Sequence, residues 1–144
     1  MTVKSFDYLP EEAKKIRTKV FIEEQGFKDE FDKIDRKAIH LVCFENEKPT
    51  ATCRIFKGEA DGEYILGRLA VIKEYRGKNI GAKMIESAEN TVRLKNGKYI
   101  ILHSQLQAKV FYSKQGYTEF GEVEDEEGCP HIWMKKILAE NSNV

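Results

Sequence analysis

Cysteine is scarce in this chain, and the three that occur, Cys43, Cys53 and Cys129, show no paired spacing. Two of them lie in short apolar runs, where cysteine behaves as a small hydrophobic residue. A disulfide framework or a zinc site needs several cysteines at regular intervals. We therefore expect neither kind of site here.

A long apolar run is also missing. No stretch approaches the roughly 20 residues that a helix needs to cross a bilayer. The first residues, Met1–Tyr8, lack the basic and then apolar pattern of a signal peptide. These absences predict a cytoplasmic protein with no membrane partner.

An excess of charge of one sign is the third absence. The 24 lysines and arginines balance the 24 aspartates and glutamates. Binding to nucleic acid in general depends on a surplus of cationic side chains that displace counterions. The balance therefore excludes generic DNA or RNA binding, although a local basic loop can still hold a phosphorylated ligand.

The chain contains enough residues for one well-packed domain. Its length of 144 residues and its 41% of apolar residues are typical of a single globular domain. Internal repeats, low-complexity segments and proline- or serine-rich linkers are absent from the sequence. We therefore expect one domain spanning residues 1–144.

Hydrophobic periodicity predicts a chain of alternating strands and helices. In chain order it predicts a helix over about 10–24, a loop or short helix over 27–37, strands over 39–45, 50–57 and 64–72, a helix from about Ile80 to Asn96-Gly97, a strand over 99–104, a short helix over 109–115, and strands over 117–123 and 131–138. The first strands form antiparallel hairpins, and the long helix makes a right-handed crossover between strands 64–72 and 99–104. The expected fold class is α/β, with a mixed, mostly antiparallel sheet and flanking helices.

The sharpest local pattern is Tyr75-Arg76-Gly77-Lys78-Asn79-Ile80-Gly81, between a strand and a helix. Glycine, and to a lesser degree asparagine, tolerates a positive φ, so backbone N–H groups can converge here. The N-terminus of the following helix adds about half a positive charge. The loop can hold a phosphate or pyrophosphate, or it can be a plain tight turn; its spacing matches neither a Walker loop nor a dinucleotide fingerprint.

This loop resembles the acyl-CoA loop of the GNAT acyltransferase superfamily. The family pattern is Arg/Gln-x-x-Gly-x-Gly/Ala, and Arg76, Asn79 and Gly81 occupy its three fixed positions. Asn79 stands where glycine is usual. A second pattern of the family, Asn-x-x-Ala-x-x-x-Tyr-x-x-x-Gly-Phe, is matched from Gln105 to Tyr117, with Gln105 in place of asparagine.

A third stretch, Val20–Gly26, with His40-Leu41-Val42 and His131, is similar to one branch of small bacterial GNAT proteins. The resemblance runs from about Ile16 to Lys136. It implies the GNAT fold and transfer of an acetyl group from acetyl-CoA to an amine acceptor. Many relatives form dimers, so a homodimer stays open.

The resemblance implies that the pantetheine arm lies along the strand over 64–72, in a gap beside the strand over 99–104. One backbone N–H would polarise the thioester carbonyl. The residues that it assigns to the donor are Leu69, Ala70, Val71, Arg76, Gly77, Lys78, Asn79, Ile80, Gly81, Gln105, Ala108, Phe111 and Tyr112.

Two proton transfers accompany the reaction. Tyr112 occupies the tyrosine position of the family, which implies that it protonates the departing thiolate; packing beside Phe111 is the alternative role. Glu24 and Glu23 are candidates for the general base or for binding the amine, because a carboxylate at a helix C-terminus is unfavourable unless it has another role. Both can also be simply solvated.

Arg68 and the histidines stay open. Arg68 interrupts an apolar strand and can pair with Asp35 or Glu23, or bind an acidic acceptor. His40, His103 and His131 are structural or catalytic. The acidic stretch 29–35 favours a cationic acceptor, although such runs are often solvated surface.

Two other readings of the chain compete with an active transferase. One is a non-catalytic module that binds or senses acyl-CoA, which the departures at Asn79 and Gln105 allow. The other is a phosphate-loop protein for a nucleotide or sugar phosphate, which requires the second motif to be coincidental.

Overall fold

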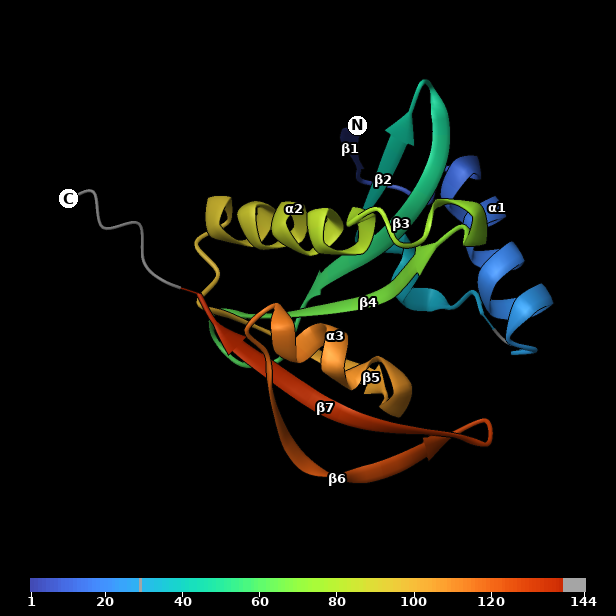
Figure 1. Cartoon of the computed structure of the whole chain (residues 1–144). Coiled ribbons are helices and arrows are strands. Elements are labelled where there is room, and N and C mark those ends of the chain that lie inside the picture. Colours follow the sequence, from blue (N-terminus) through green and yellow to red (C-terminus); the bar gives the residue numbers. More distant parts are fainter. Residues whose placement is uncertain (29, 139–144) are drawn as a thin grey trace. The chain divides into compact units, whose positions relative to one another are not determined.

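The computed structural model describes residues 1–28 and 30–138. Its helices and strands (Figure 1) are β1 (Thr2–Phe6), α1 (Glu11–Arg17), the π-helix η1 (Thr18–Glu24), the 3₁₀-helix η2 (Lys33–Arg36), β2 (Ile39–Glu45), β3 (Lys48–Lys57), β4 (Glu63–Val71), the 3₁₀-helix η3 (Lys73–Tyr75), α2 (Ile80–Leu94), β5 (Tyr99–Gln105), the 3₁₀-helix η4 (Leu106–Ala108), α3 (Lys109–Lys114), β6 (Thr118–Glu126) and β7 (Cys129–Ile137). None of the described helices is both long and apolar enough to span a bilayer.

The chain forms two compact units. The first unit combines Met1–Phe56 with Leu66–Ala88. The second combines Lys57–Ile65 with the described residues from Glu89 onward. The two units interleave along the sequence, and each is described by itself below. The single domain expected from the sequence stays a prediction.

The helix predicted over 10–24 is present, but its second half has a different geometry. α1 and η1 follow each other without a break (Figure 1), and the Gln25 N–H donates to the Val20 carbonyl at 3.1 Å, five residues back. Such π turns are rare in helices and are frequent at functional sites. The wider turn lets the adjacent residues Val20 and Phe21 both be buried.

The core of the first unit lies between this helix and the strands. Ala13, Ile16 and Val20, at three- and four-residue spacing, pack with Val42 of β2 and Ala70 of β4. The strand order in this unit is β1-β2-β3-β4, and both β1 and β3 run antiparallel to β2. The apolar stripe of the sequence therefore identified the buried face of the helix.

Two features of these strands differ from the sequence prediction. β1 was not predicted, because only Val3 and Phe6 of this strand are partly buried, which gives no strand periodicity, and the segment is stabilised by pairing with β2. β3 begins at Lys48, two residues before the predicted strand. The hairpin closes instead at Asn46 and Glu47, whose φ angles of 51° and 69° match a two-residue turn.

The second unit contains the last three strands of the seven-stranded sheet, β5, β7 and β6, in this order and paired antiparallel. Both final strands are longer than predicted, because β6 continues to Glu126 past a bulge and β7 begins at Cys129. Glu89 of α2 joins two parts of this unit. Its buried carboxylate accepts hydrogen bonds from Lys136 Nζ at 3.0 Å and from Tyr117 Oη at 3.0 Å.

Candidate active site

The loop between β4 and α2 turns at two left-handed residues. Gly77 has a φ of 81° and Asn79 a φ of 62°. Residues with a Cβ rarely adopt this conformation, and asparagine tolerates it better than most. Asn79 therefore has the backbone conformation that its replacement of glycine requires.

The turn leaves a run of backbone N–H groups open at the start of α2. Within residues 1–28 and 30–138, no hydrogen bond is donated by the N–H groups of residues 77–81, and Lys83 N donates to Asn79 O at 3.1 Å. α2 is 15 residues long, so its aligned peptide dipoles place about half a positive charge at this end. Open donors at a helix N-terminus suit a phosphate anion.

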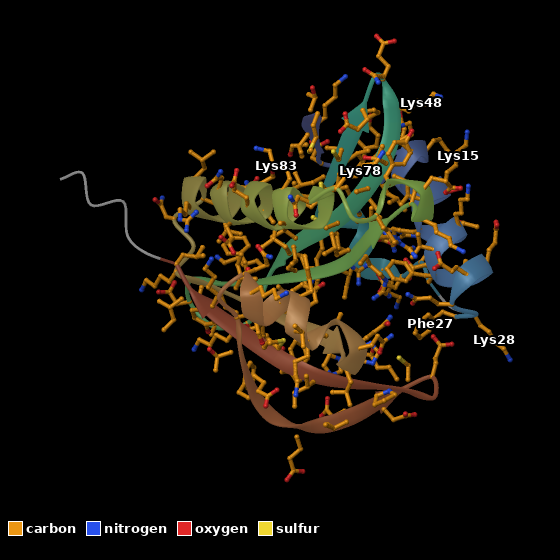
Figure 2. All side chains as sticks on the ribbon, in the orientation of Figure 1. Lys15, Phe27, Lys28, Lys48, Lys78 and Lys83 are labelled. Atoms are coloured by element: carbon orange, nitrogen blue, oxygen red, sulfur yellow. The ribbon has the colours of Figure 1, made fainter. Side chains whose placement is uncertain are left out.

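Lys78 adds a cation to this loop. Its Nζ lies 5.4 Å from the centre of the Tyr75 ring, and among the described residues it has no carboxylate partner. Figure 2 shows Lys78 on the loop before α2 and Lys83 on the helix itself. Lys83, in contrast, pairs with Glu86 at 3.2 Å. An anionic ligand could therefore bind Lys78 without displacing a carboxylate of the described residues.

Arg76 opens the loop, but its guanidinium is engaged within the protein. Nε donates to the Val71 carbonyl at 2.9 Å, and Nη1 and Nη2 donate to the two carboxylate oxygens of Glu24 at 2.7 Å and 2.8 Å. This two-pronged geometry is the strongest form of an arginine–carboxylate pair. The hydrogen bond to Glu24 raises the pKa of Arg76.

The two candidates for the general base differ in their surroundings. The hydrogen bond from Arg76 is the largest effect on Glu24 and, together with the charges of Arg76 and Lys73, lowers its pKa against the opposing effect of desolvation. A carboxylate with a lowered pKa is a weaker proton acceptor. Glu23 is exposed and has no ion pair within the described part of the chain. The base role of either residue stays a prediction.

The residues expected to line the pantetheine lie at the end of β4. Ala70 is buried in the core of the first unit, whereas Leu69 and Val71 are half-buried. Successive side chains of a strand point to opposite faces, so Leu69 and Val71 share the face away from Ala70. Their assignment to the donor stays a prediction.

The second motif lies in the second unit, at the junction of β5 and α3. Gln105 ends β5 opposite His131, Ala108 ends η4, and Phe111 and Tyr112 lie on α3. Gln105 accepts a hydrogen bond from the side chain of Gln107. The motif therefore forms a strand end followed by a short helix, as its sequence suggested.

Tyr112 is half-buried among aromatic rings. Its ring meets Phe111 edge-on at a centroid distance of 5.0 Å and Tyr117 at 6.2 Å. Its carbonyl accepts hydrogen bonds from Gln115 N at 3.0 Å and Tyr117 N at 3.1 Å, which closes α3 at the Gly116 turn. Packing beside Phe111 is thus observed, and the acid role remains a prediction.

A buried network of charged side chains in the first unit was not found from the sequence. Arg17, with 1% of its surface exposed, donates to Glu30 at 2.5 Å and to Asp35 at 2.8 Å. Arg54 donates to Asp35 at 2.9 Å and to Asp32. Two features of the sequence pointed to this network. Arg17 falls on the apolar face of the predicted first helix, and Arg54 falls within an apolar strand.

This network also holds Arg68. Arg68 has a φ of 53° within β4, and its guanidinium pairs with Glu30 at 3.0 Å and with Asp32 at 3.3 Å. Its partners are therefore neither Asp35 nor Glu23, which corrects the pairings considered from the sequence. In the acidic stretch over 29–35, the carboxylates of Glu30, Asp32 and Asp35 pair with these arginines. Asp29 lies outside the described residues.

The histidines have structural partners. His40 is buried, its Nε2–H donates to a backbone carbonyl at 2.9 Å, and desolvation lowers its pKa. His103 stacks on Trp133 with ring centres 4.5 Å apart and has Nδ1 3.0 Å from a carboxylate oxygen of Glu126. His131 donates from Nδ1 to a backbone carbonyl at 2.8 Å. These contacts favour the structural interpretation.

Known proteins are similar to this chain along most of its length. The sequence model of the family described as "Acetyltransferase (GNAT) domain" matches residues 6–138. The Bacillus subtilis (strain 168) protein YyaT is 34% identical over 137 residues, which cover 90% of each chain.

Solved structures have the same fold. A crystal structure described as that of a "putative N-acetyltransferase from Lactobacillus plantarum" has a TM-score of 0.85 and 28% identity, covering 96% of this chain and 100% of that one. An aminoglycoside 6′-N-acetyltransferase complexed with coenzyme A has a TM-score of 0.78 and 16% identity, covering 99% of this chain and 100% of that one, and supports the fold alone. The predicted α/β fold class and the resemblance are confirmed. The chain belongs to the GNAT acetyltransferase family and is an acyltransferase.

Proposed function

We propose that the protein transfers the acetyl group of acetyl-CoA directly to a primary amine. Family membership supports acyl transfer from a CoA-based donor, and one fold neighbour is an acetyltransferase complexed with coenzyme A. The observation that carries the proposal is the run of N–H groups over residues 77–81, at the N-terminus of α2, that donate to no atom of the described residues. Lys78 lies beside them and has no carboxylate partner in the same part of the chain. This set of donors fits a pyrophosphate.

In this proposal the backbone over residues 76–81 holds the pyrophosphate, with Lys78 as an additional cation. The backbone of residues 69–71 pairs with the amides of the pantetheine arm. Gln105, Ala108 and Phe111 belong to the second part of the donor site. These roles follow from the match to the family motifs.

The reaction needs no covalent intermediate on the protein. The neutral amine nitrogen attacks the thioester carbonyl carbon, the C–N bond forms and the C–S bond breaks. The amine loses one proton, and the departing thiolate gains one. Tyr112 is the proposed donor of the proton that the thiolate gains, because a phenol has a pKa close to that of an alkyl thiol.

The test is a transfer assay with the purified chain, acetyl-CoA and a panel of primary amines that includes amino acids, amino sugars, polyamines and a lysine peptide. We expect one class of amine to release the CoA thiol and to gain an acetyl group by mass spectrometry. Binding of acetyl-CoA without acetylation of any amine would favour the non-catalytic module. Binding of ATP but not of CoA would favour a nucleotide protein instead.

A cytoplasmic location and a homodimer are parts of the sequence prediction that this assay leaves open. The acceptor class is the part that it decides. Because several classes of amine are acetylated on this scaffold, the fold does not identify the acceptor.

A further inference from the structure

The Arg76 side chain joins three segments of the first unit. It binds the Val71 carbonyl at the end of β4 and the Glu24 carboxylate at the end of η1, and its own backbone opens the phosphate loop. Glu24 and Arg76 are 52 residues apart in the sequence. A guanidinium that is held at three donors has little freedom to rotate, so it fixes the backbone that carries it.

The position of Arg76 matters because the loop turns immediately after it. Arg76 is extended, with a φ of −73° and a ψ of 155°, and the left-handed Gly77 follows. The open N–H groups of residues 77–81 can converge on one anion only if the backbone at Arg76, where the loop begins, has a defined direction. Arg76 sets that direction relative to the end of β4.

Glu24 occupies a place where a carboxylate is otherwise unfavourable. It is the last residue of η1, and the helix stops beyond it at Gly26, which has a φ of 80° and donates to the Ile22 carbonyl at 3.1 Å. The C-terminal end of a helix is the negative end of its dipole. The pair with Arg76 offsets this repulsion and holds the carboxylate in one direction.

We propose that Glu24 is a positioning residue for the acyl-CoA donor, which acts through Arg76 to preform the phosphate loop. This inference rests on the proposed function, and it differs from the base role suggested by the sequence. Both carboxylate oxygens accept hydrogen bonds from Arg76, which stabilises the charged form of Glu24 and makes it a weaker proton acceptor. A positioning role uses the pair as it stands.

The test is calorimetric titration of acetyl-CoA into the wild-type chain, Glu24→Gln, Glu24→Asp, Arg76→Lys and the Glu24→Gln/Arg76→Lys double variant. The two partners are about 40% exposed, so we expect about a fivefold rise in Kd for Glu24→Gln, the size typical of an exposed two-pronged pair. Arg76→Lys should have a similar effect, because lysine cannot form the fork. The Kd of the double variant should be no higher than that of the weaker-binding single variant. Glu24→Asp keeps the charge, so its Kd should lie between those of the wild type and Glu24→Gln.

The matched control is Glu11→Gln, which removes the carboxylate of another exposed pair, with Lys14 at 3.3 Å, on the same helix. Its Kd should equal that of the wild type. All titrations are made at 25 °C, well below the thermal midpoint of each variant, so that a loss of affinity belongs to the folded protein and not to its stability.

An unchanged Kd for Glu24→Gln, beside normal binding by the wild type, would overturn this inference and leave the proposed function intact. Additive effects in the double variant would also overturn it, because they would mean that the two residues act separately. Failure of the wild type to bind acetyl-CoA would instead overturn the proposed function.

Discussion

The buried charge network makes a strong prediction for the stability of the first unit. Asp35 joins two arginines, with Oδ1 2.8 Å from Arg17 Nη1 and 2.9 Å from Arg54 Nη1. Its side chain is 6% exposed, and those of the arginines are 1% and 4% exposed. Asp35→Asn keeps the shape of the side chain but removes its charge.

The expected cost follows from this burial. Removal of one partner of a buried ion pair costs about 3–5 kcal/mol when the other charge is left buried without compensation. Arg17 keeps its pair with Glu30 and Arg54 keeps its pair with Asp32, so the cost falls at the lower end of this range. Asparagine can still accept a hydrogen bond from either arginine, so we expect about 3 kcal/mol. The pKa of Asp35 agrees in direction: it falls from 3.8 to about 2, because hydrogen bonds and charge from Arg17 and Arg54 outweigh desolvation.

The assay is urea unfolding at pH 7, followed by far-UV circular dichroism. The control is Asp61→Asn. Asp61 pairs with Lys98 at 3.3 Å, but its side chain is 92% exposed, so this pair should contribute nothing measurable to the free energy of unfolding. A free energy of unfolding for Asp35→Asn within about 1 kcal/mol of the wild type would refute the reasoning.

Three further outcomes are expected. The folded pKa of Asp35 is depressed, so its contribution is complete above the unfolded value of 3.8 and is lost as the pH falls toward about 2; equal urea midpoints at pH 5 and pH 3 would contradict this. Burial raises the pKa of the Cys53 thiol to about 12, so iodoacetamide at pH 8 should label the half-buried Cys129 first, and equal labelling rates would contradict the burial. Tyr112→Phe should lower turnover by about 100-fold with an unchanged Kd for acetyl-CoA, whereas normal turnover would remove its acid role.

The local parts of the fold were predictable from the sequence. The apolar stripe at Ala13, Ile16 and Val20 predicted the first helix, and Gly77 and Asn79 predicted the left-handed turn before α2, because both patterns depend on neighbouring residues. β1 was missed because its place depends on pairing with β2, about 37 residues later, and not on its own composition.

The charged side chains show where sequence reasoning stops. Arg17, Asp35 and Arg54 lie in three separate segments, and only the folded chain brings them together. The same holds for Glu24: its partner Arg76 lies in a loop that the sequence interpreted as a phosphate site or a plain turn, with no indication of this pair. Residue types identified candidates for chemistry, but their pairing is a property of the tertiary structure.

The measurement that tests the central claim most directly is calorimetric titration of the purified chain with acetyl-CoA, with CoA and ATP as comparisons. The account predicts micromolar binding of acetyl-CoA and CoA, no comparable binding of ATP, and strong weakening by Gly81→Glu, because a carboxylate at the helix N-terminus would repel the pyrophosphate. No binding of acetyl-CoA or CoA to the folded wild-type chain would contradict it.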